Sequence, residues 1–236
     1  MKNLITTILF LIITSFAIAQ GSLDSGVVAN YPFNGNANDL SGNGNHGTVN
    51  GALLTIDRYG NINSAYQFNG TTTDNITVPD NPTLDITNEI TLSAWVKRTR
   101  YGIDMILEKG GDWTTGTCNF GMSLHSMNNN MFYFFFNGGW RGTEGVLDFE
   151  WHHYAVVAQH GSANPLLYID GQLKSIQYSE GASTIDLTTS ALDLHIGAQI
   201  GTANYYGANI IDDVRIYNRI LTQSEILLLA GDGLVA

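Results

Sequence analysis

The fold of this chain is indicated most clearly by one stretch near its end, Ile210-Ile211-Asp212-Asp213-Val214-Arg215-Ile216-Tyr217-Asn218-Arg219. Successive side chains of a β-strand point to opposite faces, so this stretch predicts a strand with one apolar face that carries a single carboxylate. That face contains Ile210, Asp212, Val214 and Ile216. A carboxylate among aliphatic side chains is costly unless it is paired, protonated or bound to a metal. Asp212 therefore needs a partner, and a salt bridge to Arg215 or Arg58 and a bound metal ion are the alternatives.

Other stretches alternate in the same way and are separated by turns rich in Gly and Asn. The predicted strands cover residues 90–96, 151–157, 166–169 and 191–197. Asp170-Gly171 predicts a hairpin between one of them and the stretch that follows. Short strands at regular spacing indicate an all-β sandwich. A single helical turn is expected late in the chain, capped by Thr222 or Ser224 and ended by Gly231.

The beginning of the chain resembles a secretory signal peptide. Lys2 supplies a positive charge, an apolar segment follows, and Ala17-Ile18-Ala19 has the small residues of a cleavage site. We expect residues 1–19 to be removed, with a membrane anchor as the alternative. The mature protein is then secreted or at the cell surface, with no membrane insertion after cleavage. Residues 20–236 are expected to form one domain with its core at about 24–234, and the single cysteine excludes an internal disulfide.

The net charge bears on the class of partner. The chain has 21 acidic and 10 basic residues, which gives a formal charge of −11. This balance argues against nucleic acids and anionic membrane surfaces as partners and is compatible with divalent cations and neutral glycans. An anionic glycan would need a local basic patch. The sequence offers one local basic cluster, formed by Lys97, Arg98 and Arg100.

A loop rich in Asn and Gly, residues 34–47, offers many side-chain and backbone oxygens. Calcium prefers six to eight such oxygens in a flexible loop. Asp39 is the only carboxylate in this stretch, so a second carboxylate from elsewhere is needed. Asp212 is the natural candidate, and the alternative is a turn that binds no metal.

Seven blocks in order along the chain are similar to the LamG-like jelly-roll family of the concanavalin A-like lectin/glucanase superfamily. They cover residues 31–39, 41–47, 65–70, 90–97, 151–155, 167–171 and 211–219, the last followed by Glu225-Ile226. The resemblance implies a jelly-roll sandwich of two curved antiparallel sheets. It also implies a structural Ca²⁺ site, carried over here to Asp39, Asn43, Asn45 and Asp212. The resemblance is specific for fold and unspecific for function.

An aromatic stretch, residues 131–141, is the candidate binding surface. Alternation sends one set of its rings into the core and the other set, either Phe132, Phe134 and Phe136 or Tyr133 and Phe135, to the opposite face. Exposed rings can stack on the apolar C–H faces of sugars, and binding residues are frequent on loops such as the Gly-rich ones expected to carry two tryptophans. The predicted ligand-binding residues are Trp113, Tyr133, Trp140 and Arg141. A strand buried on both faces is the alternative.

Evidence for catalysis is weaker. Glu108, Lys109, His125, Tyr133 and Arg141 are residue types that a glycan-cleaving enzyme uses, but their spacing does not make them a set. The acidic motif of glucanases is absent from the sequence. We therefore expect a calcium-stabilised module that binds a glycan or cell-surface polysaccharide, or mediates adhesion. The alternatives are a polysaccharide lyase or glycoside hydrolase on the same fold, which we favour less, and a purely structural envelope protein.

Overall fold

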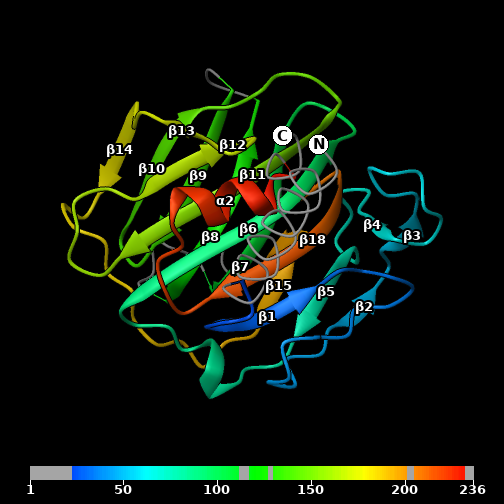
Figure 1. Cartoon of the computed structure of the whole chain (residues 1–236), viewed down its shortest axis with the longest axis horizontal. Coiled ribbons are helices and arrows are strands. Elements are labelled where there is room, and N and C mark those ends of the chain that lie inside the picture. The colour runs from blue at the N-terminus through cyan, green and yellow to red at the C-terminus, as the bar shows by residue number, and fades with distance from the viewer. Residues whose placement is uncertain (1–22, 112–116, 127–129, 201–204, 232–236) are drawn as a thin grey trace, which may run out of the picture.

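The computed structural model describes residues 23–111, 117–126, 130–200 and 205–231. Two large antiparallel sheets lie face to face with the core between them (Figure 1). We call them the front sheet, which faces the viewer in Figure 1, and the back sheet behind it. This arrangement confirms the all-β sandwich that the sequence predicts.

The front sheet has eight strands in the order β13-β12-β11-β6-β18-β4-β3, with β1 also paired to β18. Its strands are β1 (Val27–Tyr31), β3 (Leu53–Thr55), β4 (Ala65–Gln67), β6 (Glu89–Arg98), β11 (Trp151–Gln159), β12 (Leu166–Ile169), β13 (Gln172–Lys174) and β18 (Asn209–Tyr217). Strand β1 pairs with β18, so the first and last strands of the described chain are neighbours.

The back sheet also has eight strands, in the order β14-β10-β9-β8-β7-β15-β5-β2. They are β2 (Thr48–Asn50), β5 (Asn75–Val78), β7 (Ile103–Gly110), β8 (Cys118–His125), β9 (Met131–Phe136), β10 (Gly139–Glu144), β14 (Tyr178–Gly181) and β15 (Leu194–Ile196). A separate two-stranded ladder joins β16 (Ala198–Gln199) to β17 (Tyr205–Tyr206).

Two short helices complete the described structure, the 3₁₀ helix η1 (Pro82–Leu84) and helix α2 (Gln223–Leu229). Thr222 caps α2, and Glu225 closes a capping box by accepting a hydrogen bond from the Thr222 backbone N–H, which confirms the predicted cap. Helix α2 lies on the outer face of the front sheet (Figure 1). Its Ile226 belongs to a buried apolar cluster with Val157 of that sheet. Within the described part of the chain, no helix has the length and apolar character that a membrane span requires.

Strand β9 shows how the sequence forms the core. Phe132, Phe134 and Phe136 point between the sheets, and each is fully buried. Tyr133 and Phe135 point to the outer face of the back sheet. The two-residue period of a strand therefore divides one aromatic stretch between the core and a surface.

Strand β18 departs from simple alternation. Asp213 adopts a positive φ of 46°, and the register of β18 with β6 shifts between Asp212 and Arg215. This β-bulge inserts an extra residue, so Ile211 and Val214 both face the core. The prediction that Asp212 shares a face with Val214 and Ile216 is therefore wrong, and Asp212 instead faces outward beside Trp95 of β6.

A charged contact holds the start of β11 to the β12–β13 hairpin. The hairpin turn is Asp170-Gly171, as predicted, with both residues at positive φ. The His152 ring hydrogen-bonds Asp170 through Nδ1 at 2.6 Å and Asp148 through Nε2 at 3.0 Å. These carboxylates, Asp170 first, raise the pKa of His152 above its usual range.

The raised pKa of His152 predicts a pH-dependent contribution to stability. A histidine whose pKa is higher in the folded state than in the unfolded state stabilises the fold. This contribution is complete at pH values below the unfolded pKa of about 6.5 and is lost as the pH rises through the folded pKa. The stability difference between wild type and His152→Gln should therefore shrink as pH increases from about 6 to about 9. Urea denaturation at several pH values measures the free energy of unfolding of both proteins. A matched control is His160→Gln, because the His160 side chain is half exposed. A difference for His152→Gln that stays constant over this range would contradict the prediction.

Candidate functional site

The outer face of the back sheet carries a cluster of aromatic side chains that we call the aromatic platform. It consists of Tyr133 and Phe135 from β9, Trp140 from β10 and Tyr178 from β14. The ring centroids of Tyr133 and Trp140 lie 5.7 Å apart, and those of Trp140 and Tyr178 lie 6.1 Å apart. Tyr178 is 37% exposed and Trp140 is half-buried, whereas the two β9 rings form a buried floor.

Local backbone chemistry sets these rings side by side. Gly138, at φ 77°, helps close the tight turn between β9 and β10, so that Trp140 pairs with Phe135 on the same face. Gly142 pairs with Tyr133, and a Cβ atom at Gly142 would lie only 2.6 Å from the Tyr133 ring. Glycine at this position therefore leaves room for the ring to lie over β10. The expectation that Trp140 lies on a loop is wrong, because the turn ends before it.

Polar groups lie beside the aromatic platform on strand β8. Ser123 pairs with Tyr133, and the His125 ring centroid lies 4.7 Å from that of Tyr133. Ser123 Oγ and His125 Nε2 are buried and have no hydrogen-bond partner among the described residues. Burial, with a smaller contribution from Arg98, lowers the pKa of His125 to about 4, so the imidazole is neutral near pH 7. Both atoms are therefore buried polar groups whose hydrogen-bonding capacity no described residue uses.

The other predicted binding residues do not join this cluster. Arg141 follows Trp140 in β10 and points inward, where its guanidinium donates to the Ala163 and Ala182 carbonyls at 3.1 and 2.7 Å. It is 2% exposed, so the prediction that it binds ligand is corrected by strand alternation. Lys109, one of the residues considered for catalysis, faces inward for the same reason. Trp113 lies outside the described residues.

Sequence reasoning found some platform residues and missed others. Tyr133 and Trp140 were predicted from the aromatic stretch, and His125 was among the residues considered for catalysis. Ser123 was missed, although Phe120, Met122 and Leu124 alternate in a way that places it on the outer face. Tyr178 had no usable signal, because the pairing of β14 with β10 is a tertiary contact that local sequence does not encode.

The predicted calcium ligands of the Asn- and Gly-rich loop are held by internal hydrogen bonds. Asp39 Oδ1 accepts from the backbone N–H groups of Asn30 and Ser41 at 2.9 and 2.8 Å. Its Oδ2 accepts from Ser41 Oγ at 2.7 Å and from the Asn45 N–H at 3.0 Å. Four donors saturate the lone pairs of a carboxylate. Asn43 and Asn45 donate their side-chain N–H groups to the Val28 carbonyl.

Asp39 and Asp212 lie on opposite sides of strand β1. Asn30 pairs with Arg215 of β18, yet its N–H donates to Asp39 and its carbonyl accepts from Leu40. In a strand, the N–H and the carbonyl of one residue point to the same side. The Asp39 loop therefore runs along the edge of β1 that faces away from β18.

Asp212 has a different partner. Arg58 donates from Nη1 to Asp212 Oδ2 and from Nη2 to Asp213 Oδ2, each at 2.6 Å. The guanidinium also lies 4.6 Å from the Trp95 ring centroid, a cation–π contact. Burial and the adjacent Asp213 raise the pKa of Asp212 to about 7, against the opposing effect of Arg58. Of the alternatives open for Asp212, the structure contains the salt bridge to Arg58.

These contacts test whether the predicted calcium ligands fit a metal ion. Asp39 is saturated by protein donors, Asn43 and Asn45 present N–H groups, and Asp212 is paired with an arginine. Among the described residues, no group of three His, Cys, Asp or Glu side chains is arranged to hold a metal. The four predicted ligands therefore do not fit one calcium site, and calcium binding stays a prediction.

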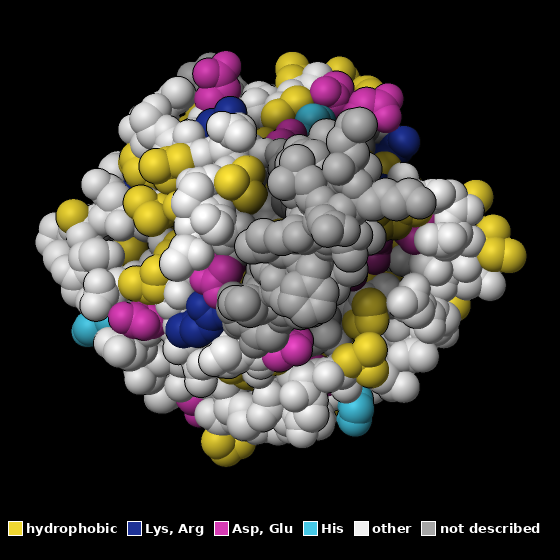
Figure 2. Space-filling view, in the orientation of Figure 1, with side chains coloured by type: hydrophobic (Ala, Val, Ile, Leu, Met, Phe, Trp, Pro, Cys, Tyr) yellow, Lys and Arg dark blue, Asp and Glu magenta, His cyan; other side chains and the backbone are white. Residues whose placement is uncertain are grey.

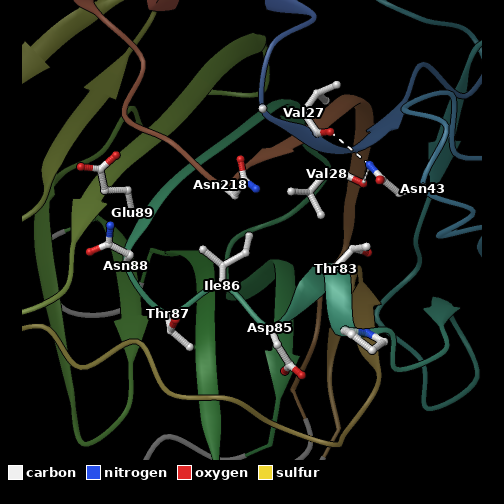
Figure 3. Close-up of a pocket in the computed structure, with 12 residues that line it drawn as sticks. Val27, Val28, Asn43, Thr83, Asp85, Ile86, Thr87, Asn88, Glu89 and Asn218 are labelled. Carbon is white, nitrogen blue, oxygen red and sulfur yellow. Dashed lines mark hydrogen bonds between the residues drawn. The ribbon is translucent and has the colours of Figure 1, made fainter.

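Asn43 also lines a polar hollow of about 370 Å³ at the edge of the sandwich. Figure 3 shows its side chain directed at the Val27 carbonyl, with Thr83 on one side and Asn88 and Asn218 across the hollow. The hollow is separate from the aromatic platform, because none of the platform residues lines it.

The ion pairs of Arg58 with Asp212 and Asp213 predict that removing the arginine charge strongly lowers the stability of the fold. Arg58→Met leaves two adjacent carboxylates without their counter-charge, one of them 4% exposed. Breaking a buried pair from one side costs roughly 3–5 kcal/mol. We expect Arg58→Met to lower the free energy of unfolding by about 3 kcal/mol, measured by urea denaturation. Lys174→Met, a cation on β13 for which no ion pair is found in the described structure, serves as the control. A loss no larger than that of the control would contradict this role.

Thermal unfolding of the wild type tests the calcium prediction. A metal bound only by the native state raises apparent stability, so its removal lowers the melting temperature. If the chain binds calcium, EDTA should lower the melting temperature of the wild type and added calcium should restore it. A melting temperature indifferent to EDTA would contradict calcium stabilisation.

Solved structures with the same fold include carbohydrate complexes. Domain 4 of AbnA, a GH43 extracellular arabinanase from Geobacillus stearothermophilus, in complex with arabinotriose, has a TM-score of 0.62 at 24% identity and covers 86% of this chain and 98% of that one. Trypanosoma rangeli sialidase in complex with 2,3-difluorosialic acid has a TM-score of 0.63 at 18% identity, covering 87% and 32%. The binding domain of botulinum neurotoxin DC in complex with SialylT has a TM-score of 0.61 at 15% identity, covering 88% and 52%.

At these identities the likeness is one of fold. No curated protein sequence is similar enough to this chain to count as a relative. The family model described as the concanavalin A-like lectin/glucanases superfamily matches residues 69–227, and the two antiparallel sheets have its jelly-roll architecture. The chain belongs to the concanavalin A-like lectin/glucanase superfamily.

Proposed function

We propose that this chain is a secreted module that binds carbohydrate through the aromatic platform and so mediates adhesion to a glycan or cell-surface polysaccharide. The observation that carries the proposal is the juxtaposition of neighbouring aromatic rings with buried polar atoms that lack hydrogen-bond partners among the described residues. Trp140 and Tyr178 are accessible, and Ser123 Oγ and His125 Nε2 lie next to Tyr133 without partners among the described residues.

The chemistry of this surface suits a sugar. Pyranose and furanose rings have apolar C–H faces that pack on aromatic faces, and hydroxyl groups that need hydrogen bonds. A buried polar atom without a partner is costly. A ligand hydroxyl that reaches Ser123 Oγ or His125 Nε2 when the side chains over them shift would remove that cost. A neutral imidazole can act as donor or acceptor toward such a hydroxyl.

The comparisons support a glycan partner in general. Structures that share the fold were solved with arabinotriose, with a sialic acid derivative and with SialylT. Fold alone does not transfer a ligand, so the support for this chain rests on its own aromatic platform.

The carboxylates that the described residues place on this face are too far apart for glycosidase catalysis. Glu108 of β7 and Glu180 of β14 lie in one row of the sheet but four strands apart, about 19 Å at about 4.8 Å per strand. Glu144 lies four residues along β10 from Trp140, the partner of Glu180, or about 13 Å away. Glycosidases need two carboxyl groups roughly 5–10 Å apart. A lyase would need a cation on the face, and the described residues place none there.

Secretion is a separate part of the proposal, and calcium binding stays a prediction outside it. The predicted signal peptide, residues 1–19, lies outside the described residues and supports export only through its sequence. The aromatic platform contains none of the predicted calcium ligands, so glycan binding does not depend on a metal at those positions.

Removing an accessible platform ring should weaken glycan binding. A glycan array identifies a ligand, and isothermal titration then compares the wild type with Trp140→Ala and Tyr178→Ala. We expect Trp140→Ala to cost about 2 kcal/mol, since central aromatic residues dominate such interfaces, which is about 30-fold in Kd. Phe149→Ala is the matched control, because Phe149 is 39% exposed and precedes β11 of the front sheet.

Two results would contradict the proposal. Equal losses in Trp140→Ala and Phe149→Ala would place the binding surface elsewhere. Shortened glycan products in the reaction mixture would show a catalytic protein instead of a binding module.

A further inference from the structure

The charged side chains that the described residues place on the outer face of the back sheet are all acidic. Glu180 pairs with Trp140, and Glu144 lies on the same face of β10. Glu108 of β7 is on this side of the sheet too, but it is fully buried and accepts a hydrogen bond from Gln199. Tyr178 donates its hydroxyl hydrogen to Glu180, so this carboxylate is fixed beside the aromatic platform.

The two cations of the back sheet point away from this face. Lys109 follows Glu108, and Arg141 follows Trp140, so alternation turns both inward. Lys109 Nζ is held by Asp80 and the Ser190 carbonyl, each at 2.5 Å. Arg141 is held by backbone carbonyls. Neither side chain can reach a ligand on the platform.

The remaining cations of the described chain belong to the front sheet or to the segments beside it: Arg58, Lys97, Arg98, Arg100, Lys174, Arg215 and Arg219. Arg98, which influences His125, is 3% exposed and bound to Asp104 at 3.0 Å. On the front-sheet side, Figure 2 shows Lys and Arg side chains lying next to Asp and Glu. Together with Lys2 these account for all 10 basic residues, so the stretches outside the described structure, apart from residues 1–22, contain no Lys or Arg.

This distribution of charge favours some classes of glycan over others. A carboxylate accepts strong hydrogen bonds from sugar hydroxyls, whereas it repels uronate, sialate and sulfate groups. A cation that would bind such groups is not available on the described face. The net charge of the whole chain, −11, adds a repulsion of the same sign at longer range.

We propose that the aromatic platform is selective for uncharged glycans, with Glu180 and Glu144 as the groups that bind hydroxyls and exclude anionic sugars. The inference rests on the proposed function, since it specifies the ligand class of the same surface.

The test compares neutral polysaccharides with anionic forms of the same backbone. Arabinan, galactan and xylan are each offered beside their chemically sulfated forms, and binding is measured by affinity electrophoresis and titration. We expect at least one neutral polymer to bind, and its sulfated form to bind at least tenfold more weakly. Glu180→Gln and Glu144→Gln should reduce the difference in affinity between the neutral polymer and its sulfated form. Glu150→Gln should not, because the Glu150 side chain is 78% exposed just before β11 of the front sheet.

The outcomes separate the inference from the proposed function. Sulfated polymers that bind as tightly as neutral ones, with both lost in Trp140→Ala, would overturn the selectivity and leave carbohydrate binding in place. A difference in affinity between neutral and sulfated polymers that is unchanged in both glutamate variants would also overturn the assigned role of these carboxylates. Failure of every polymer on this panel and on the glycan array would overturn the proposed function, and the inference with it.

Discussion

The two-residue period of the back-sheet strands is the constraint on which both the core and the candidate site depend. In β9 it sends Phe134 between the sheets and Tyr133 to the outer face. In β10 it places Trp140 outside and Arg141 inside. A register slip of one residue would exchange these faces, bury the platform rings and expose a guanidinium. The same alternation therefore fixes the stability of the sandwich and the chemical character of its binding surface.

The front sheet contains two adjacent carboxylates whose charges are compensated by one arginine. The bulge in β18 brings Asp212 and Asp213 together on one side of the strand, and Arg58 binds both while lying over Trp95. With a single cysteine in the chain, no internal disulfide can supply this cross-link. The arginine joins a loop before β4 to the last strand, two segments more than 150 residues apart in sequence. A loop that would otherwise contact the sheet only through short strands is thereby fixed to its centre.

Much of the fold could be predicted because its signals are local. The Asp170-Gly171 hairpin and the Thr222 cap follow from the residues at those positions, and the structure confirms both. The face of Asp212 could not be predicted, because alternation does not reveal that Asp213 adopts a positive φ and inserts a bulge. The site was found in part. Tyr133 lies within an aromatic stretch, whereas Tyr178 joins it only through the pairing of β14 with β10.

Chemical-shift mapping tests the central claim most directly, because it locates bound glycan without relying on a substitution. A neutral oligosaccharide that binds the protein is titrated into isotope-labelled chain, and amide and side-chain shifts are followed. The account predicts that the largest changes occur at Trp140, Tyr178, Ser123 and His125, on the outer face of the back sheet. Changes concentrated instead around Asn43 and Asn218, at the polar hollow on the edge of the sandwich, would contradict it.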